Sequence, residues 1–259
     1  MSAGKLLEGK KILIMGVANQ RSIAWAIARE YAKAGAELAF SYQNERFKDK
    51  VEKLVESEMP GSLLLPCDVT NDQNIEEMAS RLKDEWGVLH GAVHSLAYAK
   101  REELDGKFVH TSRDGFLIAH EISAYSLAAV ANHLYPLMSE GGSIITMTFQ
   151  GSERVVPNYN VMGVAKASLE ASVRYLASDL GAEGIRVNAV SAGPIRTLSA
   201  KGVKDFNSLL EGMEEKTPLR RLAQADEVAK AALFLTSDLS SAITGTVLYA
   251  DGGFHIMGA

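Results

Sequence analysis

The chain has 259 residues, of which 47% are hydrophobic and 23% charged, and its formal net charge is −5. This length and composition suit one large α/β domain and argue against a disordered chain, and the negative charge argues against a nucleic-acid-binding protein. A single cysteine, Cys67, excludes an intrachain disulfide, so we expect a buried thiol in a reducing compartment, the cytoplasm, and no apolar run is long enough for membrane insertion.

Short apolar runs alternate with helical periods through the first half of the chain. The runs predict strands buried on both faces at residues 11–15, 37–42, 62–65 and 89–94. Between them, the spacing predicts helices at residues 22–34 and 45–58 and a third helix that begins at Thr70. Gly35 is expected to end the first helix in a left-handed conformation. Residues 70–73 resemble a capping box formed by the Thr70 hydroxyl and the Gln73 side chain.

The same alternation continues through the second half. Strands are expected at residues 143–148, 185–190 and 246–250, and helices at about 112–138, 160–179 and 226–236. This order predicts a single α/β domain over residues 1–259, a Rossmann-type doubly wound parallel sheet of about seven strands with helices on both faces. The long segment after residue 190 would lie at the carboxyl edge of the sheet, and we expect residues 195–221 to form a substrate lid.

The turn between the first strand and the first helix has features of a phosphate-binding loop. A dinucleotide pyrophosphate requires close backbone approach and a helix N-terminus. Gly16 would permit the tight turn, and Ser22 and Ile23 would offer backbone N–H groups. Because only one glycine is present, the loop alone indicates cofactor binding and a plain strand–helix turn about equally.

Residues after the second and third strands indicate which dinucleotide is bound. An acidic residue at the end of the second strand favours NAD, and an arginine favours NADP. Gln43 at this place is neutral, and the nearby Glu45 and Arg46 point in opposite directions, so we expect NADH and consider NADPH less favoured. Asp68 could accept a hydrogen bond from the adenine amino group, although its position before a helix accounts for an acidic residue equally well.

Tyr159 and Lys166 follow the fifth predicted strand and are separated by seven residues, about two helical turns. If the helix includes Tyr159, both side chains face the same way. A neighbouring ammonium favours the phenolate form of a tyrosine and strengthens it as a hydrogen-bond donor. The pair therefore suits hydride transfer with stabilisation of an oxyanion, but without the surrounding sequence a packed tyrosine and an exposed lysine would be favoured.

The surrounding sequence resembles that of bacterial enoyl-acyl carrier protein reductases, a divergent branch of the short-chain dehydrogenases. The similar stretches include MGVAN at residues 15–19, PNYNVMG at 157–163, KASLE at 166–170, RVNAVSAGPIRTL at 186–198 and DGGF at 251–254. Together they extend over essentially the whole chain. Ordinary short-chain dehydrogenases carry Tyr-x-x-x-Lys, whereas Met162 stands four residues before Lys166 in this chain.

This resemblance implies that the trans-2 double bond of an enoyl thioester on acyl carrier protein is reduced by NADH, the last step of fatty-acid elongation. Tyr159 would hydrogen-bond the thioester carbonyl, and Lys166 would bind the nicotinamide ribose. The other dinucleotide contacts would be Gly16, Ser22, Ile23, Gln43, Asp68, Val69, Leu96, Ile195, Arg196, Thr197, Leu198 and Ser199. The acyl pocket would be lined by Tyr98, Ala99, Phe149, Met162, Val203 and Phe206, for which core packing is the alternative.

One position departs from the family pattern. Ten residues before the tyrosine that corresponds to Tyr159, the family usually has another tyrosine in a Ser-Tyr-Leu-Gly context. This chain has Thr148-Phe149-Gln150-Gly151 there. Phe149 has no hydroxyl to donate. Because Tyr159 is retained, we expect the missing hydroxyl to be dispensable; the two alternatives are a reduced activity and a shifted substrate preference.

The resemblance also implies a homotetramer. The basic residues Lys201, Lys204, Arg220 and Arg221 could receive an acidic carrier protein. The six histidines lack metal-binding spacing, so no metal site is expected, and His94 is most simply a packed histidine. Two alternative functions remain: an ordinary short-chain carbonyl reductase or alcohol dehydrogenase, against which the missing Tyr-x-x-x-Lys argues, and a catalytically silent dinucleotide-binding regulator.

Overall fold

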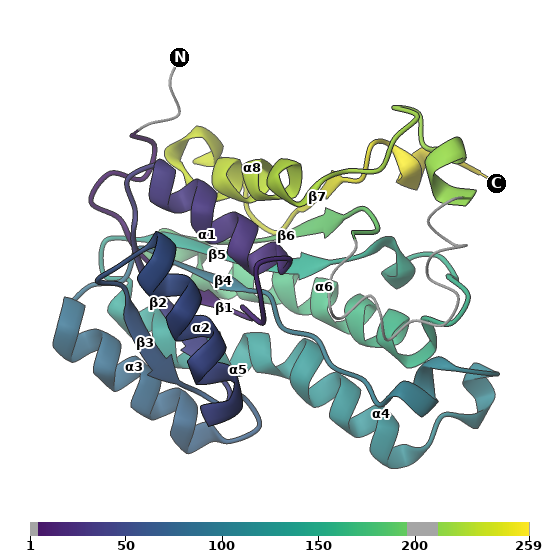
Figure 1. Ribbon diagram of the computed structural model, residues 1–259, viewed down its shortest axis with the longest axis horizontal. Helices are drawn as coiled ribbons and strands as arrows, with labels where there is room; N and C mark the ends of the chain where they lie inside the picture. Colours follow the sequence, from purple (N-terminus) through teal and green to yellow (C-terminus); the bar gives the residue numbers. More distant parts are fainter. Residues whose placement is uncertain (1–4, 196–211, 259) are drawn as a thin grey trace.

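The computed structural model describes residues 5–195 and 212–258 (Figure 1). Within these residues, seven strands form one parallel sheet in the order β3-β2-β1-β4-β5-β6-β7. The strands are β1 Lys11–Met15, β2 Glu37–Tyr42, β3 Leu63–Pro66, β4 Gly91–His94, β5 Gly142–Thr148, β6 Ile185–Ala192 and β7 Val247–Ala250. The strand order reverses between β1 and β4, and open α/β sheets bind ligands at the carboxyl edge beside such a reversal.

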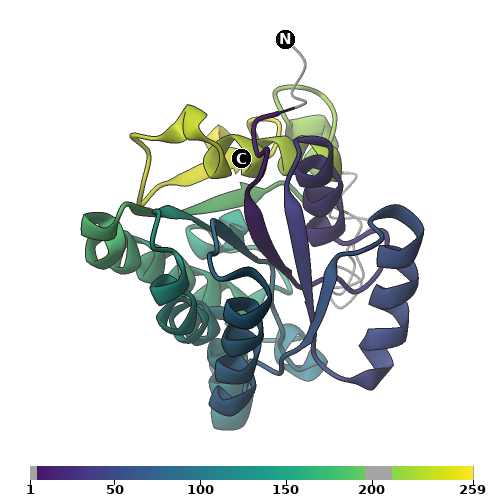
Figure 2. The ribbon, with the colours of Figure 1, turned by 90° about the vertical axis from the view of Figure 1, so that its left-hand side faces the viewer.

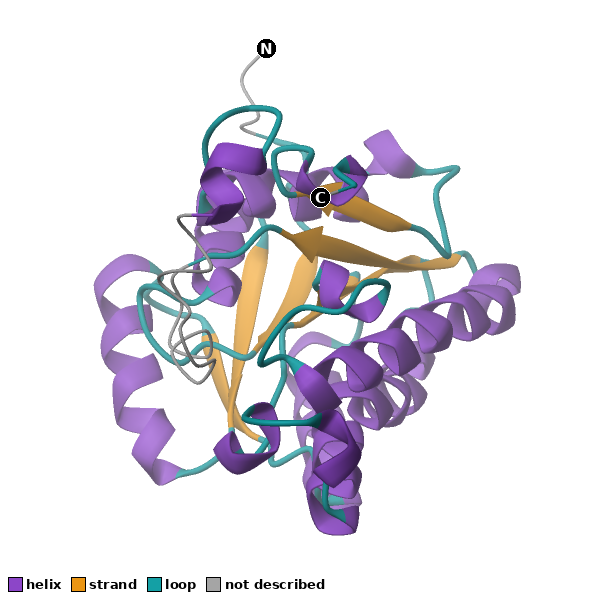
Figure 3. Cartoon of the chain, turned by 90° about the vertical axis from the view of Figure 1, so that its right-hand side faces the viewer, coloured by secondary structure: helices purple, strands orange, loops and turns teal. Residues whose placement is uncertain are grey.

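Helices cover both faces of this sheet, as Figures 2 and 3 show from two sides. One face packs against α1 (Ile23–Lys33), α2 (Glu45–Glu58) and α8 (Ala225–Thr236). The other packs against α3 (Asp72–Trp86), α5 (Ser126–Leu134) and α6 (Asn160–Leu180). Strand β1 has four consecutive buried residues because both of its faces are covered, which is why it is almost continuously apolar in sequence.

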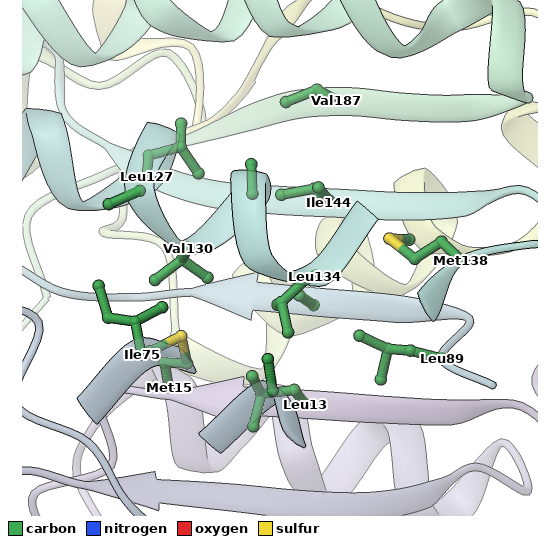
Figure 4. Close-up of a cluster of buried hydrophobic side chains, with 14 of the residues drawn as sticks. Leu13, Met15, Ile75, Leu89, Leu127, Val130, Leu134, Met138, Ile144 and Val187 are labelled. Atoms are coloured by element: carbon green, nitrogen blue, oxygen red, sulfur yellow. The ribbon is translucent and has the colours of Figure 1, made fainter. Parts of the chain in front are cut away.

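The core on the second face is built from side chains of every layer (Figure 4). Leu13 of β1 and Ile144 of β5 lie beneath Leu127 and Leu134 of α5, and Ile75 of α3 joins the same cluster. All five side chains are at most 1% exposed. This packing holds the central strands against the helices on this face.

The predicted strands and most helices are confirmed to within about two residues. The predicted end of the first helix is also confirmed: Gly35 has φ +94°, and the N–H groups of Gly35 and Ala36 donate to the carbonyls of Ala32 and Tyr31, both at 3.0 Å. These two bonds form a Schellman motif, which requires a left-handed residue that glycine adopts with little strain.

The capping box predicted at Thr70 is wrong. Helix α3 begins at Asp72, and its cap is Asn71, whose side-chain oxygen accepts from the Gln73 N–H at 3.0 Å. The Thr70 hydroxyl instead donates to Asp68 at 2.8 Å. Asparagine caps a helix as well as threonine does. The Thr70 hydroxyl does not cap the helix because it donates to the Asp68 carboxylate instead.

The single helix predicted over residues 112–138 is confirmed in extent, but a π turn interrupts its α-helical pattern. The segment consists of α4 (Arg113–His120), a π turn (Glu121–Tyr125), α5, and a 3-10 turn (Tyr135–Leu137). Two serines at the π turn bond outside the helix: Ser123 exchanges hydrogen bonds with the backbone of Tyr98 at 3.0 and 3.1 Å, and Ser126 lies 2.7 Å from His94 Nε2. Apolar periodicity does not report such contacts, so it predicted an unbroken helix.

Candidate active site

The candidate residues converge at the carboxyl edge of the sheet. Gly16 follows β1, Gln43 follows β2, Asp68 follows β3, Leu96 follows β4, and Phe149 follows β5. The strands are parallel, so these five positions lie along one edge, on both sides of the reversal between β1 and β4. The structure therefore places residues from five separate stretches of sequence along one site.

The loop after β1 is shaped by Gly16 and Ser22. Gly16 has φ +96°, and a Cβ on it would lie 2.1 Å from the Ser95 carbonyl oxygen, so no larger residue fits without a backbone shift. The Ser22 hydroxyl accepts from the N–H groups of Ala18 and Asn19 at 3.0 and 3.1 Å. The Ser22 N–H itself donates to the Asn19 carbonyl at 3.0 Å, a bond that competes with the pyrophosphate contact expected of the same group.

Gln43 and Asp68 meet at the ends of β2 and β3. The Gln43 side-chain amide donates to Asp68 at 3.1 Å, in a place where Gln43 is exposed and Asp68 half-buried. Partial burial alone would raise the pKa of Asp68, but hydrogen bonds from Thr70 and Gln43 outweigh it and hold that pKa below its usual value. Asp68 is thus an ionised acceptor beside the neutral Gln43.

Tyr159 stands immediately before α6, between two asparagines with left-handed backbone. Asn158 has φ 61° and Asn160 has φ 36°, conformations that carry strain and concentrate at functional sites. The Tyr159 ring meets the Phe149 ring edge-on, with centroids 5.1 Å apart. A Cβ on Gly151 would lie 2.4 Å from Tyr159 Cδ1, so this glycine allows the phenol to occupy its place beside β5.

The protonation state of Tyr159 differs from the expectation based on Lys166. Burial raises the pKa of Tyr159 above its ordinary value, and the charge of Glu170 raises it further. The expected lowering of this pKa by the Lys166 ammonium is therefore wrong for the structure described. Tyr159 is a neutral phenol at physiological pH, which is the form that can donate a hydrogen bond.

Lys166 is buried at the same end of β5, with 5% of its surface exposed. Its Nζ donates to the Met147 carbonyl at 2.8 Å. Burial lowers the pKa of Lys166 to about 8, and the charge of Glu170 opposes this shift. The exposed lysine considered in the sequence analysis is therefore excluded. Tyr159 contacts Phe149 and Lys166 contacts Met147, so both side chains flank the end of β5.

His94, at the end of β4, is a packed histidine, as predicted. It is 1% exposed and lies 3.0 Å from the Thr146 hydroxyl and 2.7 Å from that of Ser126. Burial, helped by the Lys166 charge, lowers the pKa of His94 to about 3, so the ring is neutral. Cys67 is likewise a buried thiol, and burial raises its pKa to about 12.

The residues expected to line the acyl pocket fall into three groups. Met162 is 6% exposed and packs with Leu104 and Ala119, and Ala99 and Tyr159 lie against this cluster. Tyr98 is 48% exposed, and its backbone is held by Ser123. Val203 and Phe206 lie outside the described residues.

The remaining predicted cofactor contacts are placed in part. Val69 is buried, Leu96 is half-buried against the core below α5, and Ile195 packs against the core on the other face. The rest of this set lies outside the described residues: Arg196, Thr197, Leu198 and Ser199. Most of the predicted lid also lies outside them, as do Lys201 and Lys204 of the proposed carrier-binding cluster. Arg221, in the same basic cluster, already pairs with Glu227 through contacts of 2.6 and 2.7 Å.

One cavity lies away from the candidate site. A cavity of about 420 Å³ lies at the opposite edge of the sheet, lined at the strand starts by Lys10, His90, Gly142 and Ile185. Within the described residues, no helix is both long and apolar enough to cross a bilayer. No cluster of three or more His, Cys, Asp or Glu in these residues is arranged to hold a metal ion.

Two comparisons of the sequence with known proteins point to one family. A family model described as enoyl-(acyl carrier protein) reductase matches residues 16–255. The enoyl-[acyl-carrier-protein] reductase [NADH] FabI of Bacillus cereus is 58% identical over 98% of this chain and 100% of the relative. That of Escherichia coli is 48% identical over 96% of this chain and 95% of the relative.

A solved structure of the Bacillus cereus enzyme with NADP+ and indole naphthyridinone superposes with a TM-score of 0.97 at 57% identity, and covers 98% of this chain and 100% of that one. The Anaplasma phagocytophilum enzyme in complex with NAD gives 0.95 at 48% identity, over 99% of this chain and 97% of that one. Sequence and fold thus agree, and the chain belongs to the enoyl-acyl carrier protein reductase family.

Proposed function

We propose that the protein reduces the trans-2 double bond of an enoyl-acyl carrier protein thioester with NADH, giving the saturated acyl thioester and NAD+. The observation that carries this proposal is the placement of Tyr159 and Lys166. A neutral phenol and a buried ammonium flank the end of β5, beside the reversal of strand order. This is the pair needed to polarise a carbonyl next to a bound dinucleotide.

The residues present fit a dinucleotide. Gly16 lets the first loop pass close to the end of β4, which places the start of α1 at the reversal between β1 and β4. Asp68, held ionised, would accept from the adenine amino group, and Gln43 would lie near the adenine ribose. Lys166 would hold the nicotinamide ribose. NADH, when bound, supplies the hydride that the β-carbon of the substrate receives.

Tyr159 would act on the thioester carbonyl. Its O–H donates to the carbonyl oxygen, and this bond strengthens as the oxygen gains the negative charge of an enolate. Since burial raises the pKa of Tyr159, the phenol keeps its proton while it donates. A proton added at the α-carbon then completes the reduction. The donor is fixed before the substrate arrives, because Gly151 and Phe149 confine its ring.

Three finer statements complete the proposal. The substrate chain is presented by acyl carrier protein, the active form is a homotetramer, and the enzyme works in the cytoplasm. The names of the FabI relatives support the first, because they specify a carrier-linked substrate for those proteins. The tetramer and the cytoplasmic location rest on resemblance to the family.

The test follows the loss of NADH absorbance on mixing the protein with a trans-2-enoyl thioester, and identifies the product by mass. We expect rapid loss and a saturated thioester. In Tyr159→Phe, kcat should fall by about 100- to 1,000-fold, the usual effect of losing one oxyanion donor, while NADH still binds. NADH binding without turnover on any enoyl thioester would contradict the proposal and favour the silent regulator.

A further inference from the structure

Two adjacent residues at the end of β5 are each hydrogen-bonded to a residue of α6, and these two partners lie one helical turn apart on the helix. The Met147 carbonyl accepts from Lys166 Nζ at 2.8 Å, and the Thr148 hydroxyl donates to Glu170 Oε1 at 2.5 Å. All four residues are at most 7% exposed. These bonds form a clamp between the last two residues of β5 and the first half of α6, the helix that carries Lys166 and begins just after Tyr159.

The clamp contains a buried cation and a buried carboxyl group on one helix. Positions 166 and 170 are four apart, so both side chains project from the same face of α6. The proposed function uses Lys166 but gives Glu170 no task. A buried acidic side chain costs folding free energy unless it has a compensating partner, and the structure gives it Thr148 as a hydrogen-bond partner.

The titratable groups next to the clamp on β4, on β7 and just before α6 are neutral near pH 7. His94 of β4 faces Lys166, and its pKa is lowered to about 3 by burial and by the Lys166 charge. Burial raises the pKa values of Tyr159 and of Tyr249 on β7, and the charge of Glu170 raises both further. Two further acidic side chains act on Tyr249: Glu153, which accepts from its hydroxyl at 2.6 Å, and Asp251.

We propose that Glu170 is a positioning residue: held by Thr148, it ties α6 to β5 beside the bond from Lys166 to Met147, and its carboxylate, one helical turn from Lys166, favours the ammonium that would bind the nicotinamide ribose. The inference deepens the proposed function and rests on the role given there to Lys166. Glu170 itself touches neither substrate nor cofactor. It acts through the charge and the place of Lys166.

The pH dependence of cofactor binding is the property that a purely structural role of Glu170 would not change. Lys166 has a pKa of about 8, which burial depresses and the Glu170 charge raises. In the wild type, NADH binding should therefore weaken as pH rises through about 8. Without the Glu170 charge, the pKa of Lys166 falls further, so binding should weaken at a lower pH.

The experiment measures the NADH dissociation constant between about pH 6 and 9 for Glu170→Gln. Its midpoint for loss of binding should move down by about one pH unit, with about fivefold weaker binding at pH 8, nearly tenfold at pH 9 and little change at pH 6. In turnover, KM for NADH should rise while kcat at saturating NADH stays within about twofold. Asp179→Asn, which removes an exposed carboxylate from the same helix, should follow the wild-type profile.

Two Thr148 variants provide a second route if Glu170→Gln does not fold. Thr148→Ser keeps the hydroxyl and should bind NADH like the wild type. Thr148→Val releases the carboxylate without removing its charge, so its midpoint should move in the same direction by less. A lower melting temperature in Glu170→Gln or Thr148→Val, with an unchanged binding midpoint, would overturn the inference.

Lys166→Met separates failure of this inference from failure of the proposed function. If Glu170 acts through Lys166, adding Glu170→Gln to Lys166→Met should not weaken NADH binding further, and a further loss would overturn the inference. If Lys166→Met binds NADH like the wild type, the proposed role of Lys166 fails and the inference fails with it. If Lys166→Met weakens binding while Glu170→Gln does not, only the positioning role is wrong.

Discussion

At one end of the site, Gln43 and Asp68 meet in contact with solvent, whereas at the other end Lys166 and Glu170 are at most 7% exposed. The first pair is held by one hydrogen bond between exposed or half-buried side chains. The second is clamped to β5 by two bonds among buried groups. Buried charges interact strongly and tolerate loss of a partner poorly, while exposed pairs are screened by water. Substitutions should therefore have large effects at the buried end and small ones at the exposed end.

The largest effect on NADH affinity is expected at Gly16. This residue follows β1, which lies between the exposed pair after β2 and β3 and the buried pair beside β5. In Gly16→Ala, the new Cβ would meet the Ser95 carbonyl oxygen at 2.1 Å, and φ +96° is itself strained for alanine. The loop must shift, so NADH affinity should fall by roughly 100-fold, about 2.7 kcal/mol, as measured by fluorescence titration.

Gly61→Ala is the matched control for that substitution. Gly61 has φ +88°, but a Cβ there meets nothing within 4 Å. It should destabilise the fold by about 1–2 kcal/mol and leave NADH binding unchanged. If Gly16→Ala bound NADH like the wild type, the close approach of this loop would have no part in binding.

His94, at the buried end of the site, should make the free energy of unfolding depend on pH. Its pKa is about 3 in the folded protein and about 6.5 when unfolded. Below pH 6.5 the unfolded chain binds a proton at His94 and the folded chain does not. The free energy of unfolding present above pH 6.5 is therefore lost progressively as pH falls toward 3. The slope should approach about 1.4 kcal/mol per pH unit.

Urea unfolding of His94→Gln between about pH 6.5 and 5 tests this prediction. The variant cannot titrate at this position, so its stability should fall by about 2 kcal/mol less than that of the wild type over this range. Exposed His110→Gln is the control and should keep the wild-type slope. Equal slopes in wild type and His94→Gln would mean that His94 titrates in the folded protein.

A smaller effect is expected at Phe149. Its ring packs edge-on against Tyr159 and already confines the phenol, so a second hydroxyl is not needed to hold it. Phe149→Tyr should change kcat by less than tenfold, or about 1.4 kcal/mol, in the NADH assay. A larger gain would show that the missing hydroxyl limits the reaction.

The smallest effect should come from the exposed end. Gln43→Ala removes the hydrogen bond to Asp68, one of several that the carboxylate accepts. We expect NADH affinity to fall by about threefold, or 0.6 kcal/mol, by the same titration. A loss as large as that in Gly16→Ala would remove the contrast between the exposed and buried ends.

Sequence reasoning was most successful where local chemistry decides the structure. Apolar runs located the strands because both faces of the sheet are covered, and Gly35 marked a helix end because only a left-handed residue completes the turn. It also brought Gly16, Asp68, Tyr159 and Lys166 to one edge, because parallel strands end there.

It was least successful where contacts join distant segments. Ser123 and Ser126, at the π turn of the long helix, bond to the loop after β4 and to His94, which no periodicity reveals. Thr148 and Glu170 lie 22 positions apart in sequence, and their bond depends on how α6 packs on β5. One signal was available: Glu170 is an acidic residue on a helix face that is mostly apolar apart from Lys166, which stands four residues before it.

The central claim is that hydride reaches the β-carbon of an enoyl thioester while the carbonyl is only polarised by Tyr159. The most direct test uses NADH carrying deuterium at the transferred position, in ordinary water, and locates the label in the product by NMR. We predict one deuterium at the β-carbon, a solvent proton at the α-carbon, and an intact thioester. Deuterium on the former carbonyl carbon, with the double bond retained, would contradict this claim and identify a carbonyl reductase.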